Sequence, residues 1–234
     1  MNKNVAVFLQ TATGREIPLS RNREGAYEAP EGRCEIRAEH VGVAQILRVR
    51  AALTAAGETL SEDAALTVRL PNRKVQFVAD KMHGDFWCRP EFGGELSKVP
   101  PRTQALLWKE GKVWRLLWPL CGKKFNCVLS GGEKGLDIQL FSFAPGLTEI
   151  PETACVLLAA GKDPHALLRG AAEAAERVLC GRVKTIDRKT FPEIFEYLGW
   201  CSWDAFQIRV SETGLAEKAD EFLAKKIPVR WCII

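Results

Sequence analysis

The sequence predicts a mainly β protein, in which an antiparallel β-sandwich is followed by a helical connector and a strand–helix–strand (βαβ) unit. Short apolar runs separated by turn residues dominate residues 1–160. An amphipathic helical period takes over within residues 161–195. A short strand, a helix and a second strand then follow in residues 196–234. We therefore expect three regions with these boundaries: a sandwich domain, a helix with its connector, and the βαβ unit.

The sandwich is predicted most strongly by two hairpins. In residues 103–120, "EGK" separates two runs rich in Leu and Trp, and Gly111 can take the positive φ that such a turn needs. In residues 124–144, "SGGEKG" joins two further strand-like runs. Many short strands with frequent turns and no helix are typical of an antiparallel sandwich. The other strands that we expect are Val5–Leu9, Cys34–Ala38, Ala44–Arg50, Ala65–Leu70 and Val75–Ala79.

The connector begins with a helix whose ends are marked in the sequence. Asp163 is placed as the N-cap, Pro164 occupies the first helical position, and Gly181 follows the last turn. An irregular segment with a proline stop leads on from this helix to residue 195. The apolar positions between the two ends recur at helical spacing, at residues 167, 168, 171, 174, 175, 178 and 179.

The βαβ unit is predicted from three successive patterns. Tyr197–Cys201 is short, apolar and aromatic, Glu212–Lys226 carries one apolar face, and Val229–Ile234 is largely β-branched and apolar. Two strands joined by a helix pair in parallel within a sheet that is covered on both faces. One such unit leaves a sheet edge and a sheet face uncovered, so it is not a stable domain by itself.

Composition and charge exclude several classes of protein. With 47% hydrophobic and 26% charged residues the chain is globular in composition. The net charge of +4 is scattered along the chain, which argues against a nucleic-acid partner. No segment approaches the length of a transmembrane helix, and the amino-terminal apolar run is too short for a signal peptide. We expect no membrane partner and leave the oligomeric state open, a homo-oligomer included.

The cysteines and histidines suggest neither a metal site nor a cofactor. The eight cysteines form no CxxC motif and lie mostly within apolar runs, as buried free thiols of a reducing compartment do. We therefore expect a cytoplasmic protein. The three histidines lack metal-ligand spacing with any cysteine. The glycine-rich stretches lack the pattern of a phosphate-binding loop, so no cofactor is expected.

Residues 198–206, "LGWCSWDAF", together with "IPVRWCII" at residues 227–234, carry a family resemblance. This stretch, the helix after it and the following strand resemble the junction found in raffinose synthases, seed imbibition proteins and alkaline α-galactosidases of glycoside hydrolase family 36. The resemblance covers roughly the last two thirds of the chain and is weaker before Val99. One departure is Trp231, at a position where the family usually has a smaller aliphatic residue.

The resemblance implies an amino-terminal β-supersandwich followed by a (β/α)₈ TIM barrel, of which the βαβ unit is the beginning. It also implies a retaining enzyme acting on α-galactoside oligosaccharides, whose catalytic carboxylates lie beyond residue 234. We accordingly expect no catalytic residue in this chain, and expect the chain alone to be inactive. Two alternatives stay open: a galactosyltransferase of the raffinose synthase type, and a non-catalytic carbohydrate-binding or assembly module.

Substrate-binding residues are expected just after the first barrel strand, since barrel sites lie at the carboxyl ends of strands. Ser202, Trp203 and Asp204 occupy that place. By resemblance Trp203 lies against a galactose ring, whose apolar C–H face matches an indole face. The alternative for Trp203 is a packing role at the end of the barrel or at the sandwich interface. Asp204 either binds a sugar hydroxyl, holds Trp203 in place, or accepts backbone N–H groups in a turn.

Two more tryptophans invite comparison with Trp203. Trp87 lies in a Gly- and Pro-rich stretch of the sandwich domain, and the resemblance implies that a loop there reaches over the barrel mouth. Trp87 is therefore a third candidate for substrate binding, although most single tryptophans belong to a core. Trp200 faces the opposite side of its strand from Trp203, and we expect it to pack in the core.

Overall fold

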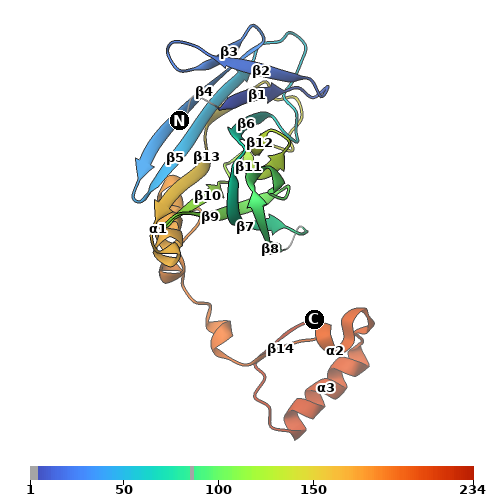
Figure 1. Ribbon diagram of the computed structural model, residues 1–234. Coiled ribbons are helices and arrows are strands. Elements are labelled where there is room, and N and C mark those ends of the chain that lie inside the picture. Colours follow the sequence, from blue (N-terminus) through green and yellow to red (C-terminus); the bar gives the residue numbers. More distant parts are fainter. Residues whose placement is uncertain (1–4, 85–86) are drawn as a thin grey trace. The chain divides into compact units, whose positions relative to one another are not determined.

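A computed structural model describes residues 5–84 and 87–234. The chain divides into two compact units, residues 1–185 and residues 186–234, and each is described by itself. In its described residues the first unit contains one antiparallel sheet and one long helix (Figure 1). Within the described residues its elements are β1 (Ala6–Gln10), β2 (Glu16–Arg21), β3 (Tyr27–Ala29), β4 (Gly32–Val41), β5 (Ala44–Leu53), β6 (Leu66–Pro71), β7 (Lys74–Met82), β8 (Cys88–Glu95), η1 (Leu96–Lys98), β9 (Thr103–Glu110), β10 (Val113–Pro119), β11 (Asn126–Gly132), β12 (Gly135–Phe141), β13 (Glu149–Gly161) and α1 (Pro164–Val178).

The large sheet closes on itself around the main core. Its strands follow the order β10-β13-β5-β4-β3-β2-β1-β6-β12-β11-β9-β7-β8, and β9 also pairs with β10. In Figure 1, β4, β5 and β13 form one wall and β6, β12 and β11 lie opposite them. Side chains from both walls meet in one buried cluster that includes Leu47, Val49, Leu66, Ile138 and Leu140. The expected mainly β fold with a large antiparallel sheet is confirmed.

Both expected hairpins are present, but the second has a tighter turn than the sequence suggests. Gly111 joins β9 to β10 with φ of 61°. In the second hairpin the strands extend through residues 130–132 and 135, so only Glu133 and Lys134 lie between them. Gly131 is part of β11, where its N–H donates to the Val99 carbonyl at 2.7 Å and a Cβ would lie 2.5 Å from the Ser97 carbonyl oxygen. This glycine thus serves a close backbone approach rather than the turn.

The strands β2, β3, β8 and β13 were not predicted from the sequence. Strand β8 reads "CRPEFGGE" and lies at the edge of the sheet, where β7 is its strand partner within the described residues. An edge strand tolerates proline and glycine because one side of its backbone needs no ladder partner. Composition alone therefore marks this stretch as loop.

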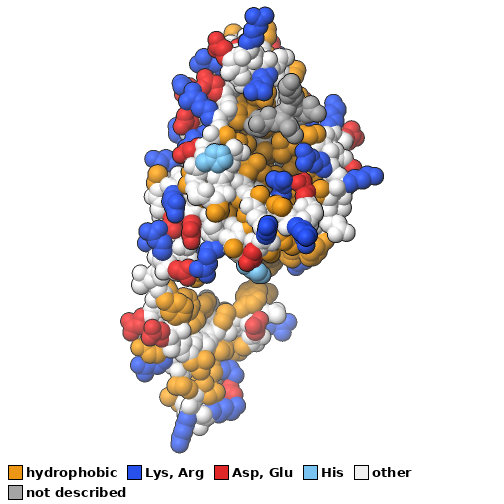
Figure 2. Space-filling view, turned by 60° about the vertical axis from the view of Figure 1, so that its left-hand side comes forward, with side chains coloured by type: hydrophobic (Ala, Val, Ile, Leu, Met, Phe, Trp, Pro, Cys, Tyr) orange, Lys and Arg blue, Asp and Glu red, His pale blue; other side chains and the backbone are white. Residues whose placement is uncertain are grey.

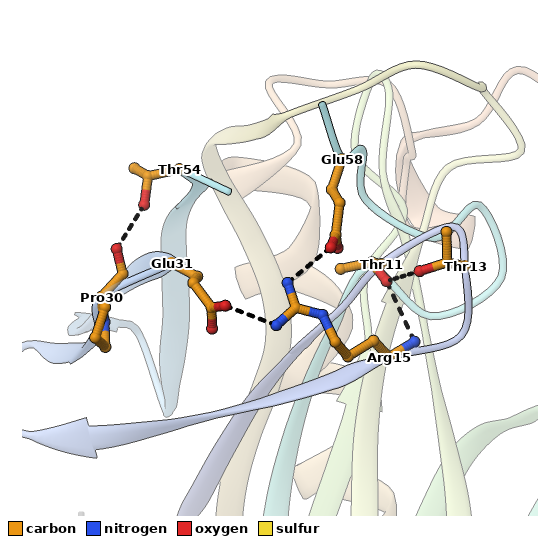
Figure 3. Close-up of polar contacts among 7 residues, drawn as sticks. All are labelled: Thr11, Thr13, Arg15, Pro30, Glu31, Thr54 and Glu58. Atoms are coloured by element: carbon orange, nitrogen blue, oxygen red, sulfur yellow. Dashed lines mark hydrogen bonds and ion pairs between the residues drawn. The ribbon is translucent and has the colours of Figure 1, made fainter. Parts of the chain in front are cut away.

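Three turns at one end of the sheet are joined by Arg15 (Figure 3). Its guanidinium donates to Glu31 at 2.7 Å and to Glu58 at 2.8 Å, while its backbone N–H donates to the Thr11 hydroxyl. Glu31 follows β3 and Glu58 lies in the loop after β5. One side chain therefore connects segments that are far apart in the sequence.

Helix α1 packs on the outer face of β5, β10 and β13. The Asp163 side chain accepts hydrogen bonds from the N–H groups of His165 and Ala166, and Pro164 is the first helical residue, so the expected N-cap is confirmed. The helix buries most of its apolar stripe and forms a second cluster with the sheet, whose members include Ile46, Leu116, Leu157, Leu167, Ala171 and Ala174. The helix and the main core thus lie on opposite faces of the same strands.

The second unit contains a parallel pair of short strands joined through helices. After η2 (Ile186–Arg188) and η3 (Glu193–Glu196) come β14 (Gly199–Cys201), α2 (Trp203–Phe206), η4 (Gln207–Arg209), α3 (Glu212–Ala224) and β15 (Trp231–Ile233). β14 and β15 pair in parallel, with Trp200 opposite Cys232. Both strands are shorter than the sequence suggests, since Tyr197, Leu198 and Val229 lie outside them.

The expectation of buried cysteines is wrong for most of the eight. Cys34, Cys127 and Cys155 are buried, whereas Cys88, Cys121, Cys180, Cys201 and Cys232 are exposed, and all are free thiols. Cys201 was expected to be buried and is not. It lies in a two-stranded sheet that no further described strand covers.

Candidate functional site

The candidate site lies where β14 ends and α2 begins. The Ser202 N–H donates to the Ile233 carbonyl at 2.9 Å, which continues the pairing of β14 with β15 beyond the last strand residue. The Ser202 carbonyl in turn accepts from the N–H groups of Ala205 and Phe206 at 3.1 and 2.9 Å. The buried Ser202 thus joins strand to helix directly, and the next two side chains project from the strand end.

Trp203 is the first residue of α2 and is 59% exposed. An exposed indole at the carboxyl end of a parallel strand offers an apolar face and an N–H donor to a ligand. The ring is therefore accessible to a sugar. The role of Trp203 in binding stays a prediction.

Asp204 follows in the first turn of α2 and is exposed. Within the part of the chain described, no hydrogen bond joins its carboxylate to a backbone N–H group. The turn-capping role is therefore not observed there. A free carboxylate beside Trp203 is able to accept hydrogen bonds from sugar hydroxyls. The structure brings Trp203 and Asp204 together as neighbours on one short helix.

Trp200 packs on the opposite side, as the alternation along the strand predicts. Its ring lies 5.5 Å from Phe222 of α3 and 6.0 Å from Phe206, both in edge-to-face geometry. Trp200 has packing contacts as expected, but it is half-buried and not part of a buried core. Its ring holds α3 against β14. Trp200 therefore packs against the two helices next to the candidate site and is not itself a candidate ligand contact.

Trp231, where the sequence departs from the family pattern, has a packing role that sequence reasoning missed. Its ring covers Gly199, because a Cβ at that position would lie 2.1 Å from the ring atoms. Its Nε1 donates to the Tyr197 carbonyl at 3.1 Å, and Phe195 packs edge-to-face against it at 5.8 Å. A glycine on one short strand and a tryptophan on the next, at Gly199 and Trp231, are the two sequence features from which this packing could have been inferred.

Trp87 belongs to the first unit and precedes β8. It is 61% exposed, and its carbonyl accepts from the His83 N–H at 3.1 Å. The exposed ring is free of the core, contrary to the usual position of a single tryptophan. Since Trp203 and Asp204 belong to the second unit, the three predicted residues share no element.

Acidic side chains of α3 form a solvated face. Glu221 binds Lys225 at 2.5 Å and also binds Lys218, and these ammonium groups lower the pKa of its carboxyl to about 2. A carboxylate held ionised in this way is unsuited to act as a general acid. Among the described residues no group of three or more His, Cys, Asp or Glu side chains is placed to hold a metal ion, and no helix is long and apolar enough to cross a bilayer.

Comparison with known proteins gives consistent matches. A family model described as "Raffinose synthase or seed imbibition protein Sip1" matches residues 87–234. A galactinol–sucrose galactosyltransferase of Pisum sativum is 33% identical over 137 residues, which cover 56% of this chain and 17% of the pea protein. Stachyose synthase of the same species is 27% identical over 154 residues, covering 64% of this chain and 18% of that protein.

A galactinol–sucrose galactosyltransferase of Oryza sativa subsp. japonica is 32% identical over 156 residues, covering 62% of this chain and 20% of the rice protein. The chain thus spans about a fifth of the length of the curated relatives it matches. Among solved structures, the family 36 α-galactosidase AgaB of Geobacillus stearothermophilus aligns with a TM-score of 0.37 and 9% identity, over 96% of this chain and 38% of that one. A TM-score this low does not establish a common fold.

Proposed function

Because the chain belongs to the family of raffinose synthases and seed imbibition proteins, we propose that it is the amino-terminal portion of an enzyme that cleaves α-galactosides. The observation that carries the proposal is the family match over residues 87–234, which includes the "GWCSWDAF" stretch at the end of β14. The share of the relatives' length that the chain spans supports a larger parent protein. The proposed reaction is double displacement at a galactosyl group.

In this proposal the second unit is the beginning of a (β/α)₈ barrel. The parallel pairing of β14 with β15 across α3 supports it, since barrel strands are parallel and each is followed by a helix. The sandwich domain would then be residues 1–160, the helix and connector residues 161–195, and the first barrel segment residues 196–234. Trp203 would stack on galactose and Asp204 would bind its hydroxyls, with Trp87 as a further contact.

The catalytic carboxylates would lie beyond residue 234. Retaining hydrolysis needs two carboxyl groups roughly 5 Å apart, one as nucleophile and one as acid and then base. The acidic residues of the second unit do not support such a pair, since those of α3 face solvent and Glu221 is held ionised by two lysines. The 234-residue chain is accordingly proposed to be inactive alone.

A second candidate is transfer of the galactosyl group to a sugar acceptor. The names of the matched relatives favour it, since they are galactinol–sucrose galactosyltransferases and a stachyose synthase. Hydrolysis and transfer share the first displacement and differ in whether water or a sugar hydroxyl attacks the intermediate. The first strand of a barrel does not distinguish the two acceptors.

A non-catalytic binding module would be favoured by a complete sheet around residues 229–234. Within the described residues β15 has β14 as its one strand neighbour, so this support is lacking. The enzyme proposal needs no complete sheet in this segment.

The test compares the 234-residue protein with the same chain extended by its genomic continuation. We expect no release of nitrophenol from a nitrophenyl α-galactoside by the short chain, and turnover by the long one. With galactinol and sucrose as substrates, raffinose among the products indicates transfer and free galactose indicates hydrolysis. Sustained turnover by the short chain would show that its own residues supply the carboxylates.

In the extended protein, Trp203→Ala should lower kcat/KM by about tenfold to a hundredfold if the ring stacks on galactose. Trp200→Ala is the control, because it removes a packing ring from β14, three residues before Trp203. The Trp200 variant should have a lower melting temperature than the parent, whereas the Trp203 variant should keep the parent's melting temperature.

A further inference from the structure

The closed sheet of the first unit has a cavity at one end, opposite the end that Arg15 ties together. The cavity lies beside the turns that join β4 to β5 and β9 to β10, and near the last residues of β13 and β6. Its volume is about 560 Å³, within the range of roughly 300–1,000 Å³ that is usual for small-molecule sites. The mouth of a closed sheet is one of the places where such sites occur.

The inner lining of the cavity is largely apolar, and His40 and Gln45 are its polar members among the described residues, besides two arginines. Trp108, Leu117 and Leu158 face the inside of the sheet from three neighbouring strands, and Leu70 and Leu96 line it from the other wall. Figure 2 shows hydrophobic side chains gathered in a recess on this unit, with lysine and arginine side chains near them. An apolar body would therefore lose part of its contact with water on entering.

Two arginines line the cavity, and they share one carboxylate. Arg115 Nε donates to Glu110 at 2.7 Å, and Arg73 Nη1 donates to the same carboxylate at 3.4 Å. Glu110 also accepts from Trp108 Nε1 at 3.0 Å, which fixes it beside the cavity. Among the described residues that line the cavity none is acidic. Two guanidinium groups against one carboxylate leave an excess positive charge at the mouth.

The arginines have capacity to bind a further anion. A guanidinium carries five N–H donors, and the contact with Glu110 uses one donor of each arginine. Both side chains are about half exposed, at 46% for Arg115 and 49% for Arg73, so their remaining donors are accessible. Guanidinium groups bind carboxylates and similar oxyanions through paired hydrogen bonds.

We propose that this cavity binds a small amphipathic anion, whose apolar body lies against Trp108 and Leu117 and whose carboxylate or sulfonate meets Arg73 and Arg115. The site is separate from the proposed galactoside site, since a galactoside is uncharged and the residues proposed for it do not line the cavity. It would make the first unit a ligand-binding domain in its own right.

The test uses two dyes with the same apolar body. One is 8-anilinonaphthalene-1-sulfonate, and the other is N-phenyl-1-naphthylamine, which lacks the sulfonate. We expect the 234-residue protein to bind both, and the anionic dye with one site per chain. In the double variant Arg73→Gln/Arg115→Gln the affinity for the anionic dye should fall about tenfold, and that for the neutral dye less than about twofold.

Arg48→Gln is the matched control for charge. Arg48 is ion-paired with Glu39 at 2.6 Å, as Arg115 is with Glu110, but it does not line this cavity. Its substitution should leave both affinities unchanged. An equal loss of anionic-dye affinity in this variant, or no loss in the double variant, would overturn the assignment of the anion to Arg73 and Arg115.

Two variants fill the cavity from different strands. Ala160→Trp on β13 and Gln45→Trp on β5 place an indole where the apolar body should lie, and both positions are accessible enough to accept it. Each should weaken binding of both dyes by at least about tenfold, with an unchanged circular dichroism spectrum. If one variant does not fold, the other decides. Dye fluorescence that persists in full in a folded variant places the dyes elsewhere and overturns the proposal.

Discussion

Asp137 and Arg69 form a largely buried ion pair between β12 and β6. The carboxylate accepts from Arg69 Nε at 2.7 Å and from Nη2 at 2.9 Å, and the guanidinium lies 4.8 Å from the ring of Phe8. Asp137→Asn removes the charge from a bidentate pair and should lower the free energy of unfolding by about 2 kcal/mol. Urea denaturation followed by circular dichroism measures this loss.

Glu35→Gln is the matched control for that substitution. Glu35 pairs with Arg37 at 3.0 Å, but both side chains are well exposed. An exposed pair typically contributes less than about 1 kcal/mol, so the control should differ little from the parent. Equal losses in the two variants would contradict the importance given to burial.

The buried thiols should differ sharply from the exposed ones in reactivity. Burial raises the pKa of Cys34 and of Cys155 to about 12, and it raises the pKa of Cys127 as well. The thiolate is the form that alkylates, so at pH 8 these residues carry almost none of it. Iodoacetamide should label the five exposed cysteines of the native protein, and all eight only after unfolding. Peptide mass spectrometry identifies the sites, and rapid native labelling of Cys155 would contradict this prediction.

At the level of elements, the start of α1 depends on one side chain. The Asp163 carboxylate accepts from the N–H groups of His165 and Ala166 at 2.8 and 3.4 Å. Asp163→Ala leaves these donors without a partner and should cost about 1 kcal/mol of stability. Asp163→Asn should cost much less, because asparagine caps helices about as well. Urea denaturation of both variants checks the difference, and equal losses would indicate that charge near the helix end matters more than the cap.

Elements with strong local signals could be predicted, and those defined by their neighbours could not. Asp163 predicts a helix start and Gly111 predicts a hairpin turn from local sequence alone, and both elements are present. Strand β8 exists because β7 lies beside it, and no local preference for a strand is visible in its sequence. The same limit applies to cysteine burial, since Cys201 has an apolar sequence context but little structure around it.

In the candidate site, too, the residues with a local sequence signal could be predicted, and those that depend on distant partners could not. Trp203 and Asp204 were predicted to lie at the end of the strand, and their place there follows from a short-range pattern around β14. The role of Trp231 was missed because it depends on Gly199, a partner more than thirty residues away in sequence. The cavity beside Arg73 and Arg115 was missed for the same reason, since its lining comes from strands scattered through the first unit.

At the level of the whole molecule, the two units differ greatly in how much side-chain surface they bury. The first unit contains two apolar clusters. In the second, Ser202 is the one buried residue among those described, and the parallel strands are three residues long. A helix of thirteen residues such as α3 is marginal in water by itself. The second unit therefore gains little stability from its own core.

Hydrogen exchange should expose this difference directly. We expect amides of residues 186–234 to exchange within minutes, while those of β5 and β12 stay protected for hours, because exchange reports the free energy of local opening. A variant that ends at Thr185 should keep the melting temperature of the full chain, since the two apolar clusters lie within residues 1–185. A melting temperature lowered by several degrees, or protection of residues 186–234 equal to that of β5, would show that the second unit is stabilised by more than its own contacts.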